Sequence, residues 1–218
     1  EDVFERAVVV MVKFISHVAN TYGYKLEVLN LGGGYGVRYV DSDPVLDIPA
    51  KIESVAQTLK DTCRMFNIQV PKILMEPGRS IVADAGMTLY TAGNVKKIPG
   101  YKNYVSVDGG MTDNPRYALY RSKYTVLAAG KMNESANMAC SLAGRCCESG
   151  DLISDSAHLP ASTERGDIIA VCTTGAYCYS MASNYNRIPR PPVVMLKDGE
   201  SYVAVRRESL EDLVKLDV

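Results

Sequence analysis

The sequence predicts two regions of different fold class, an α/β region over residues 1–86 and a mostly antiparallel β region over residues 87–218. Two observations predict this division. Before Gly86, segments with helical hydrophobic spacing alternate with short apolar runs, an order typical of parallel strands joined by helical crossovers. After Gly86, short β-prone runs follow one another, separated by Gly, Pro, Asn and Asp.

The α/β region is predicted to run helix, strand, helix, strand, helix. Its elements are expected over residues 2–20 with Gly23 as the stop, 26–31, 49–66 with Pro49 in the first turn, 72–75 and 79–86. Two strands are too few for a closed barrel or a complete open sheet, so we expect the sequence to begin within a domain. Unpaired strands expose apolar edges. We therefore expect residues 1–86 to be held by a partner chain or to be incorrectly packed.

The β region is predicted to contain seven strands and a final short helix. The strands are expected over residues 87–95, 104–107, 124–128, 138–142, 168–171, 193–196 and 202–205, and the helix near 209–216.

Composition excludes several classes of function. With 47% hydrophobic residues and a net charge of -1, the chain has an ordinary core and no bulk field for nucleic acid or an anionic membrane. No apolar run reaches the roughly 18 residues of a membrane span. The six cysteines form no CxxC pair, and the two histidines lie far apart, so we predict no metal site. Reduced cysteines indicate a cytoplasmic protein.

Two motifs follow the two predicted parallel strands. Residues 31–36 (LGGGYG) let backbone N–H groups approach a phosphate without obstruction by a Cβ atom. Residues 76–79 (EPGR) open a predicted helix whose N–H groups and positive dipole end favour an anion. Carboxyl ends of parallel strands meet at one edge of a sheet, so both motifs would converge on one phosphate. The alternatives are a tight turn and a solvated Glu–Arg pair.

Three motifs in the β region suggest a polar pocket. Arg116 could clamp a carboxylate bidentately, and Tyr120 lies on the same side if this segment is a helical turn; a plain polar turn is the alternative. Cys147 and Glu148 place a thiol beside a carboxylate, which suits proton transfer, although a buried cysteine near a turn has the same pattern. Residues 175–186 surround three tyrosines with small and polar residues, as in a pocket wall.

The motifs occur in the order LNLGGGYG, MEPGR, VDGGMTDNPRYALY, CCESGD and GAYCYSMASNYN. In this order the chain resembles, from about residue 30 to about residue 190, the diaminopimelate decarboxylase family of fold-type III enzymes that use pyridoxal 5'-phosphate (PLP). The resemblance implies that residues 1–86 are the last part of a TIM-like (β/α)8 barrel and that residues 87–218 are the C-terminal β-domain.

The resemblance also implies roles for individual residues. Glu76 is expected against the pyridine nitrogen, and Cys147 is expected to donate the proton that replaces CO₂. The cofactor-binding residues implied are Gly33, Gly34, Glu76, Pro77, Gly78, Arg79 and Tyr177, and the substrate-binding residues are Arg79, Arg116, Tyr120, Glu148 and Tyr177. Because Cys147 and Glu148 of this family reach the neighbouring subunit's site, a homodimer is implied.

The implied reaction is decarboxylation of meso-2,6-diaminopimelate to L-lysine. The Schiff-base lysine of the family lies upstream of these motifs, so we expect the sequence to be the C-terminal portion of a longer protein and to be inactive alone. An ornithine- or arginine-type decarboxylase and a non-catalytic relative are the alternatives. A dinucleotide-dependent oxidoreductase would rest on the glycine cluster alone, which is not GxGxxG.

Overall fold

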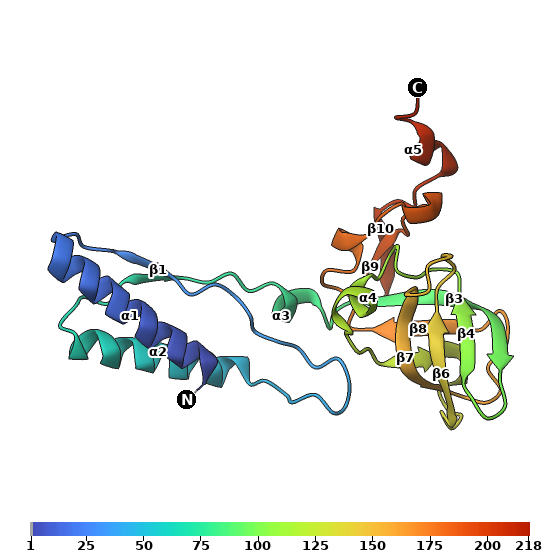
Figure 1. Ribbon diagram of the computed structural model, residues 1–218, viewed down its shortest axis with the longest axis horizontal. Coiled ribbons are helices and arrows are strands. Elements are labelled where there is room, and N and C mark those ends of the chain that lie inside the picture. The colour runs from blue at the N-terminus through green and yellow to red at the C-terminus, as the bar shows by residue number, and fades with distance from the viewer. Residues whose placement is uncertain (1) are drawn as a thin grey trace. The chain divides into compact units, whose positions relative to one another are not determined.

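The computed structural model describes residues 2–218 and divides them into two compact units (Figure 1). Unit 1 comprises the described residues up to Arg38 together with Asp43–Ile81, and unit 2 comprises Tyr39–Ser42 and Val82–Val218. The division after Ile81 lies a few residues before the predicted one after Gly86. Residues 39–42 group with the second unit although they lie between two elements of the first.

Unit 1 contains the predicted helices and strands. Helix α1 (Val3–Tyr22) starts in a capping box of Asp2 and Glu5. It ends at Gly23, whose left-handed conformation (φ 66°) is typical of the residue that follows a helix. Helix α2 (Ile48–Met65) is capped by Asp47 and packs against α1. Strands β1 (Val28–Asn30) and β2 (Lys72–Leu74) form a parallel pair.

The core of unit 1 lies between the two helices and the strand pair. Its buried members are Val8, Val12, Ile15, Leu29, Val55, Leu59 and Cys63. Outward-facing residues of the short sheet remain accessible, with Val28 50% and Leu74 44% exposed. These side chains lie on the face of the strand pair opposite buried Leu29; whether a partner chain holds this unit stays a prediction.

Unit 2 is built on a six-stranded sheet in the order β5-β8-β3-β4-β6-β7. The strands are β3 (Met87–Lys97), β4 (Asn103–Val107), β5 (Val126–Ala128), β6 (Met138–Ala143), β7 (Leu152–Leu159) and β8 (Ile168–Cys172). All neighbours are antiparallel except β4 and β6, so the predicted mostly antiparallel sheet is confirmed. The edge strands β5 and β7 contact each other, and the sheet is nearly closed around a buried core.

The sequence prediction missed β7. Its burial does not alternate regularly, and register shifts interrupt its pairing with β6. Polar residues such as Ser154 and Asp155 in this strand further obscured the period-two pattern.

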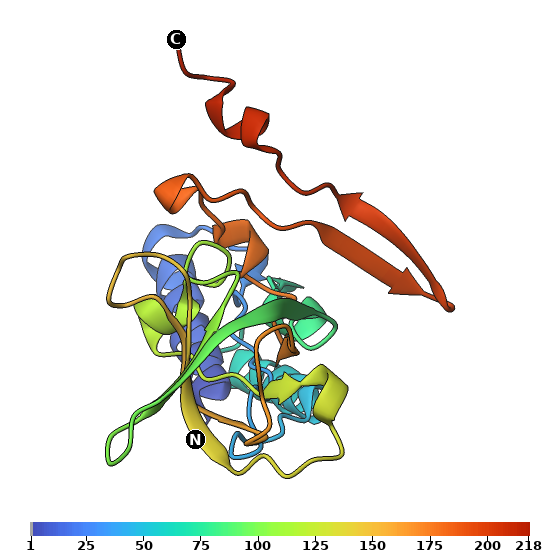
Figure 2. The same ribbon diagram turned by 90° about the vertical axis from the view of Figure 1, so that its right-hand side faces the viewer.

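The end of the chain forms a separate hairpin and a short helix, drawn in orange and red in Figure 2. Strands β9 (Val193–Lys197) and β10 (Glu200–Val205) pair antiparallel across Asp198 and Gly199, whose φ angles of 53° and 81° suit a two-residue turn. Helix α5 (Leu210–Val214) follows a capping box at Ser209. Among residues 2–218, none of the helices has the length and apolar character needed to cross a lipid bilayer.

Candidate active site

The glycine motif and the EPGR motif lie side by side in unit 1, at the carboxyl ends of β1 and β2. Backbone pairing continues beyond both strands: the Leu31 N–H donates to the Leu74 carbonyl at 3.0 Å, and the Glu76 N–H donates to the Gly32 carbonyl at 2.8 Å. The convergence that the parallel-strand argument predicted is therefore present in the backbone.

The side chain of Asn30 holds Glu76 in place. The Asn30 amide donates to Oε1 of Glu76 at 2.6 Å, and Oδ1 of Asn30 accepts from the Gly32 N–H at 2.7 Å. Asn30 thus joins the carboxylate to the glycine loop and orients it. Sequence reasoning missed Asn30, although its place as the last strand residue before the glycines was a usable signal.

Glycine is required at two neighbouring positions of this loop for different reasons. A Cβ atom on Gly33 would lie 2.2 Å from the Glu76 carbonyl oxygen, so the close approach of the two motifs depends on its absence. Gly34 has a φ of 100°, which residues with a Cβ rarely adopt. Within residues 2–218, the N–H groups of Gly33 and Gly34 donate no hydrogen bond to the chain, which leaves donors for an anion.

The third helix is shorter than predicted. Helix α3 spans only Arg79–Val82, and the expected extension to residue 86 is wrong. Beyond it the backbone of Ala83 and Gly86 bonds to residues 174 and 175, and a Cβ on Gly175 would lie 1.9 Å from the Val82 carbonyl oxygen, so this segment cannot continue as a helix. A single helical turn has only a small macrodipole. Gly78 and Arg79 would therefore attract an anion through their local N–H groups and the charge of Arg79.

In unit 2, Arg116 lies in a cage of tyrosines. Helix α4 (Arg116–Tyr120) is the helical turn that places Arg116 and Tyr120 on one side. The Arg116 guanidinium carbon lies 5.0 Å from the ring centre of Tyr177, 5.5 Å from that of Tyr39 and 5.9 Å from that of Tyr120. Nη1 of Arg116 donates to the Tyr39 hydroxyl at 2.8 Å. Three predicted substrate-site residues, Arg116, Tyr120 and Tyr177, therefore lie together. Tyr39 lies with them and was not predicted from the sequence.

The Arg116 guanidinium is charged although it is only 6% exposed. Burial alone would lower the pKa of Arg116, but the hydrogen bond to Tyr39 and the nearby Tyr124 raise it above its ordinary value. Nε of Arg116 is buried without a hydrogen-bond partner in the described chain, so this cation retains donor capacity for a ligand. Tyr177 has a φ of 70°, an unusual conformation for a tyrosine and one found at ligand sites.

Asp151 fastens together the two loops that carry the remaining site residues. Its carboxylate accepts from the Met111 N–H at 2.6 Å and from the Cys146 N–H at 2.7 Å. A Cβ on Gly110 or Gly144 would lie 2.4 or 2.2 Å from Asp151 Oδ1, so both loops close tightly around this side chain. Asp151 was not predicted, because its partners lie up to 40 residues away in sequence.

A second buried carboxylate holds the loop before Arg116. Asp113 accepts from the Tyr90 hydroxyl and, at 2.8 Å, from the Gly110 N–H. Burial raises the pKa of Asp113, and the hydrogen bond from Tyr90 opposes that rise. The loop 109–116 is therefore held at its centre as well as by Asp151.

The two adjacent cysteines differ in environment. Burial, and then the charge of Asp151, raise the pKa of Cys146 to about 11, so its thiol stays protonated at neutral pH. Cys147 is exposed, and its Sγ accepts from the Asn186 amide at 3.7 Å. Glu148 is exposed and accepts from the Gly150 N–H at 3.1 Å. Of the two, Cys147 is the thiol available to a ligand.

The predicted site residues thus form two groups. Unit 1 holds Gly33, Gly34, Glu76, Pro77, Gly78 and Arg79, and unit 2 holds Arg116, Tyr120, Cys147, Glu148 and Tyr177. Each group is ordered by its own backbone contacts. In the part of the chain from residue 2 onward, no three His, Cys, Asp or Glu side chains gather as metal ligands.

Residues 22–175 match the family model of the pyridoxal-dependent decarboxylase C-terminal sheet domain. The chain is similar to curated diaminopimelate decarboxylases: 49% identical to that of Bacillus subtilis (strain 168) over 91% of this chain and 45% of the relative, and 36% identical to that of Mycobacterium tuberculosis over 100% and 50%. The chain therefore spans about half the length of the curated relatives it matches.

Solved structures show the same likeness. The diaminopimelate decarboxylase of M. jannaschii, in co-complex with L-lysine, has a TM-score of 0.86 at 29% identity, covering 99% of this chain and 48% of that chain. The Helicobacter pylori enzyme complexed with L-lysine has a TM-score of 0.84 at 33% identity, covering 98% and 50%.

Proposed function

Because the chain belongs to the pyridoxal-dependent decarboxylase family, we propose that it forms the C-terminal part of a diaminopimelate decarboxylase, which converts meso-2,6-diaminopimelate to L-lysine. The proposal includes a preceding barrel segment, of which unit 1 would be the end. The homodimer and the cytoplasmic location stay predictions.

The observation that carries the substrate assignment is the Arg116 cage. A buried guanidinium with a donor left over suits a carboxylate at the far end of a substrate, because charge-assisted hydrogen bonds to a carboxylate are strong and directional. Glu148 offers a negative charge for a distal amino group. A cation together with a carboxylate fits the zwitterionic distal end of diaminopimelate, whereas ornithine presents only an amine there.

The residues of unit 1 fit a phosphate-bearing, pyridine-containing cofactor. Gly33 lets the two motifs approach closely because it has no Cβ to meet the Glu76 carbonyl, and the N–H groups of Gly33 and Gly34 donate no hydrogen bond within residues 2–218. Gly78 and Arg79 belong to the EPGR motif that this loop contacts. Glu76, oriented by Asn30, presents a carboxylate that would hold a protonated ring nitrogen. When bound, PLP supplies an electron sink for loss of CO₂.

The chain's own side chains then have distinct tasks in the proposed reaction. Arg116 and Tyr120 bind and orient the distal carboxylate, and Tyr177 lies beside Arg116 where it can contact the substrate. Cys147 holds the proton that replaces CO₂ at the α-carbon. The exposed thiol of Cys147 suits this task better than that of Cys146, which is partly buried and has a raised pKa.

The test compares substrates with the intact protein loaded with PLP. We expect CO₂ release from meso-2,6-diaminopimelate and little from L-ornithine or L-arginine. Arg116→Gln should raise KM for diaminopimelate by about 10- to 100-fold, since one or two charge-assisted hydrogen bonds are lost. Arg165→Gln, which changes an exposed arginine outside the cage, is the matched control and should leave KM unchanged.

Three outcomes would contradict the proposal. Turnover of ornithine or arginine without turnover of diaminopimelate would assign the chain to a sister decarboxylase. PLP binding without turnover of any of the three would favour a non-catalytic relative. An unchanged KM in Arg116→Gln would remove Arg116 from the substrate site.

A further inference from the structure

The exposed thiol of Cys147 has a specific hydrogen-bond donor in the same chain. Nδ2 of Asn186 lies 3.7 Å from Sγ of Cys147, within the range of a hydrogen bond to sulfur. The two residues are 39 positions apart in sequence, so the contact depends on the fold of unit 2. It was not predicted from the sequence.

The backbone around Asn186 is held in an unusual conformation. Asn186 has a φ of 53° and Arg187 a φ of 55°, two consecutive non-glycine residues in the left-handed region. Such residues cost free energy and persist only where their surroundings enforce them, often at functional sites. Asparagine tolerates this region better than most residues, which makes it a suitable carrier of the amide at this position.

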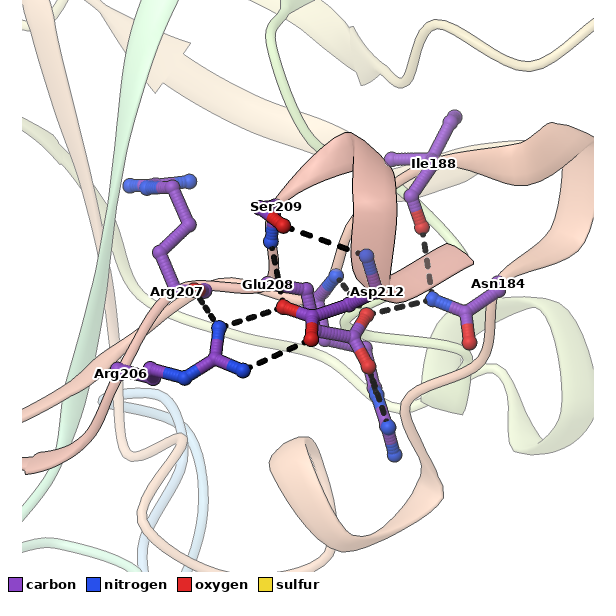
Figure 3. A network of polar contacts seen from close by, with 8 residues as sticks. Asn184, Ile188, Arg206, Arg207, Glu208, Ser209 and Asp212 are labelled. Atoms are coloured by element: carbon purple, nitrogen blue, oxygen red, sulfur yellow. Dashed lines mark hydrogen bonds and ion pairs between the residues drawn. The ribbon is translucent and has the colours of Figure 1, made fainter. Parts of the chain in front are cut away.

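A network of polar contacts includes Asn184 and Ile188, which lie on either side of Asn186 in the sequence (Figure 3). The Asn184 amide donates to the Ile188 carbonyl at 3.0 Å and to Oε2 of Glu208 at 2.7 Å. Glu208 also accepts from the backbone N–H and the side chain of Arg190. Glu208, which precedes the capping box of α5, therefore holds the segment 184–190 on both sides of Asn186.

The residue before this segment bonds to one loop of the candidate site, and Arg187 bonds to the end of the chain. The Ser183 N–H donates to the Thr112 carbonyl at 2.8 Å, in the loop that leads to Arg116. Arg187 pairs with Asp217 and donates to the Leu213 carbonyl at 2.9 Å. The segment that carries Asn186 is therefore tied to the loop before Arg116 at Ser183, and the Asn186 amide itself contacts Cys147.

Charged and titratable groups face Cys147 from two segments. The charge of Cys147 is the main cause of the raised pKa of Tyr185, followed by burial, by the charges of Glu148 and Cys146 and by a hydrogen bond between Tyr185 and Cys147. Tyr185, Glu148 and Cys146 therefore lie near this exposed thiol. Among these neighbours Asn186 is distinguished as a neutral donor that does not change its charge with pH.

We propose that Asn186 is a positioning residue for Cys147: its amide donates to the sulfur, favours the thiolate over the thiol and fixes the direction of the S–H bond. The proposal rests on the proposed role of Cys147 as proton donor. A donor to sulfur keeps the side chain in one rotamer and directs its proton away from the Asn186 segment. No other reactant is needed, because the hydrogen bond transfers no proton.

The test measures the rate of alkylation of Cys147 by iodoacetamide in the intact protein, by peptide mass spectrometry across a range of pH. Asn186→Asp replaces the donor by a carboxylate and keeps a residue that tolerates the left-handed region. We expect alkylation of Cys147 at pH 8 to slow by about three- to tenfold and its pH profile to move upward by about 0.5 to 1 unit.

A second variant separates the amide from the backbone. Asn186→Gly retains the left-handed conformation without strain and should move the pH profile in the same direction by a smaller amount. Asn67→Gly is the matched control, because Asn67 is exposed, has a φ of 50° and lies in unit 1. The half-buried Cys172 serves as the internal reference for folding, and its rate should not change.

The inference is overturned if Cys147 in both Asn186 variants has the rate and pH profile of the wild-type protein. It is also overturned if Asn67→Gly produces the same change. The readout needs no substrate, so it is independent of the proposed reaction. An inactive protein with Asn186-dependent alkylation would contradict the proposed function alone, and an active protein without that dependence would contradict this inference alone.

Discussion

Replacing Asp151 with asparagine should loosen both site loops of unit 2 at once. The side chain is 4% exposed and its carboxylate accepts two short hydrogen bonds, from Met111 at 2.6 Å and from Cys146 at 2.7 Å. An amide of the same shape can accept only one of them and turns its NH₂ group toward the other N–H. The variant therefore loses one charge-assisted bond and leaves one buried donor unsatisfied.

The expected loss of stability follows from these two terms. A hydrogen bond to a charged group contributes roughly 1.5–3 kcal/mol, and an unsatisfied buried donor costs about 1–3 kcal/mol, with part of each recovered by relaxation. We expect unit 2 to be destabilised by about 2–4 kcal/mol. At about 4 °C per kcal/mol for a domain of this size, the melting temperature should fall by roughly 8 to 16 °C.

The assay is thermal unfolding followed by circular dichroism, with Asp198→Asn as the control. Asp198 lies in the exposed turn between β9 and β10, so its replacement should change the melting temperature by about 1–2 °C at most. A melting temperature for Asp151→Asn within the range of this control would refute the reasoning. Alkylation of Cys146 in Asp151→Asn should also be faster, because the loop that shields this thiol would open and because the charge of Asp151 no longer raises the pKa of Cys146.

Three further changes test other parts of the structure. Gly33→Ala should abolish PLP uptake, measured by visible absorbance, because its Cβ would displace the Glu76 carbonyl; Gly36→Ala, with open space around its Cβ, should bind PLP normally. Tyr39→Phe keeps the ring beside Arg116 but removes a hydrogen bond, and should raise KM for the substrate about three- to tenfold. Arg190 lowers the pKa of Glu208 to about 2, so the stability from this clamp is present above pH 4.5 and is lost as the pH falls toward 2; the hydrogen-exchange protection factors of residues 184–190, which compare each rate with the intrinsic rate at the same pH, should fall over that window.

Each of these expectations has a contradicting result. Normal PLP binding by Gly33→Ala would show that the loop can move away from β2. An unchanged KM for Tyr39→Phe would mean that Arg116 is held by packing alone. Protection factors of residues 184–190 that are constant between pH 5 and 2 would mean that Glu208 does not clamp this segment.

Local sequence patterns predicted most elements of the fold because their causes are local. Hydrophobic spacing located α1 and α2, and Gly23 was correctly identified as the end of α1. The failures have non-local causes. The extension of α3 was excluded by the close packing of Gly86 against Gly175, and β7 was hidden by irregular pairing with β6.

The candidate site divides in the same way. Motif residues such as Arg116 and Tyr177 could be found from the sequence, and the structure brings these two together. The residues that hold them, Tyr39, Asp151 and Asn186, could not be found, because each acts on a partner far away in the chain. Long-range partners leave no periodicity and no motif in a single sequence.

The shared carboxylate of Asp151 makes the conformational free energies of two loops interdependent. A ligand that orders the loop before Arg116 lowers the entropy that remains to be lost when the Cys147 loop closes. By thermodynamic reciprocity, a partner surface that orders the Cys147 loop strengthens ligand binding beside Arg116 by the same factor. Assembly and substrate affinity would then be two measurements of one coupling, set by a single buried side chain.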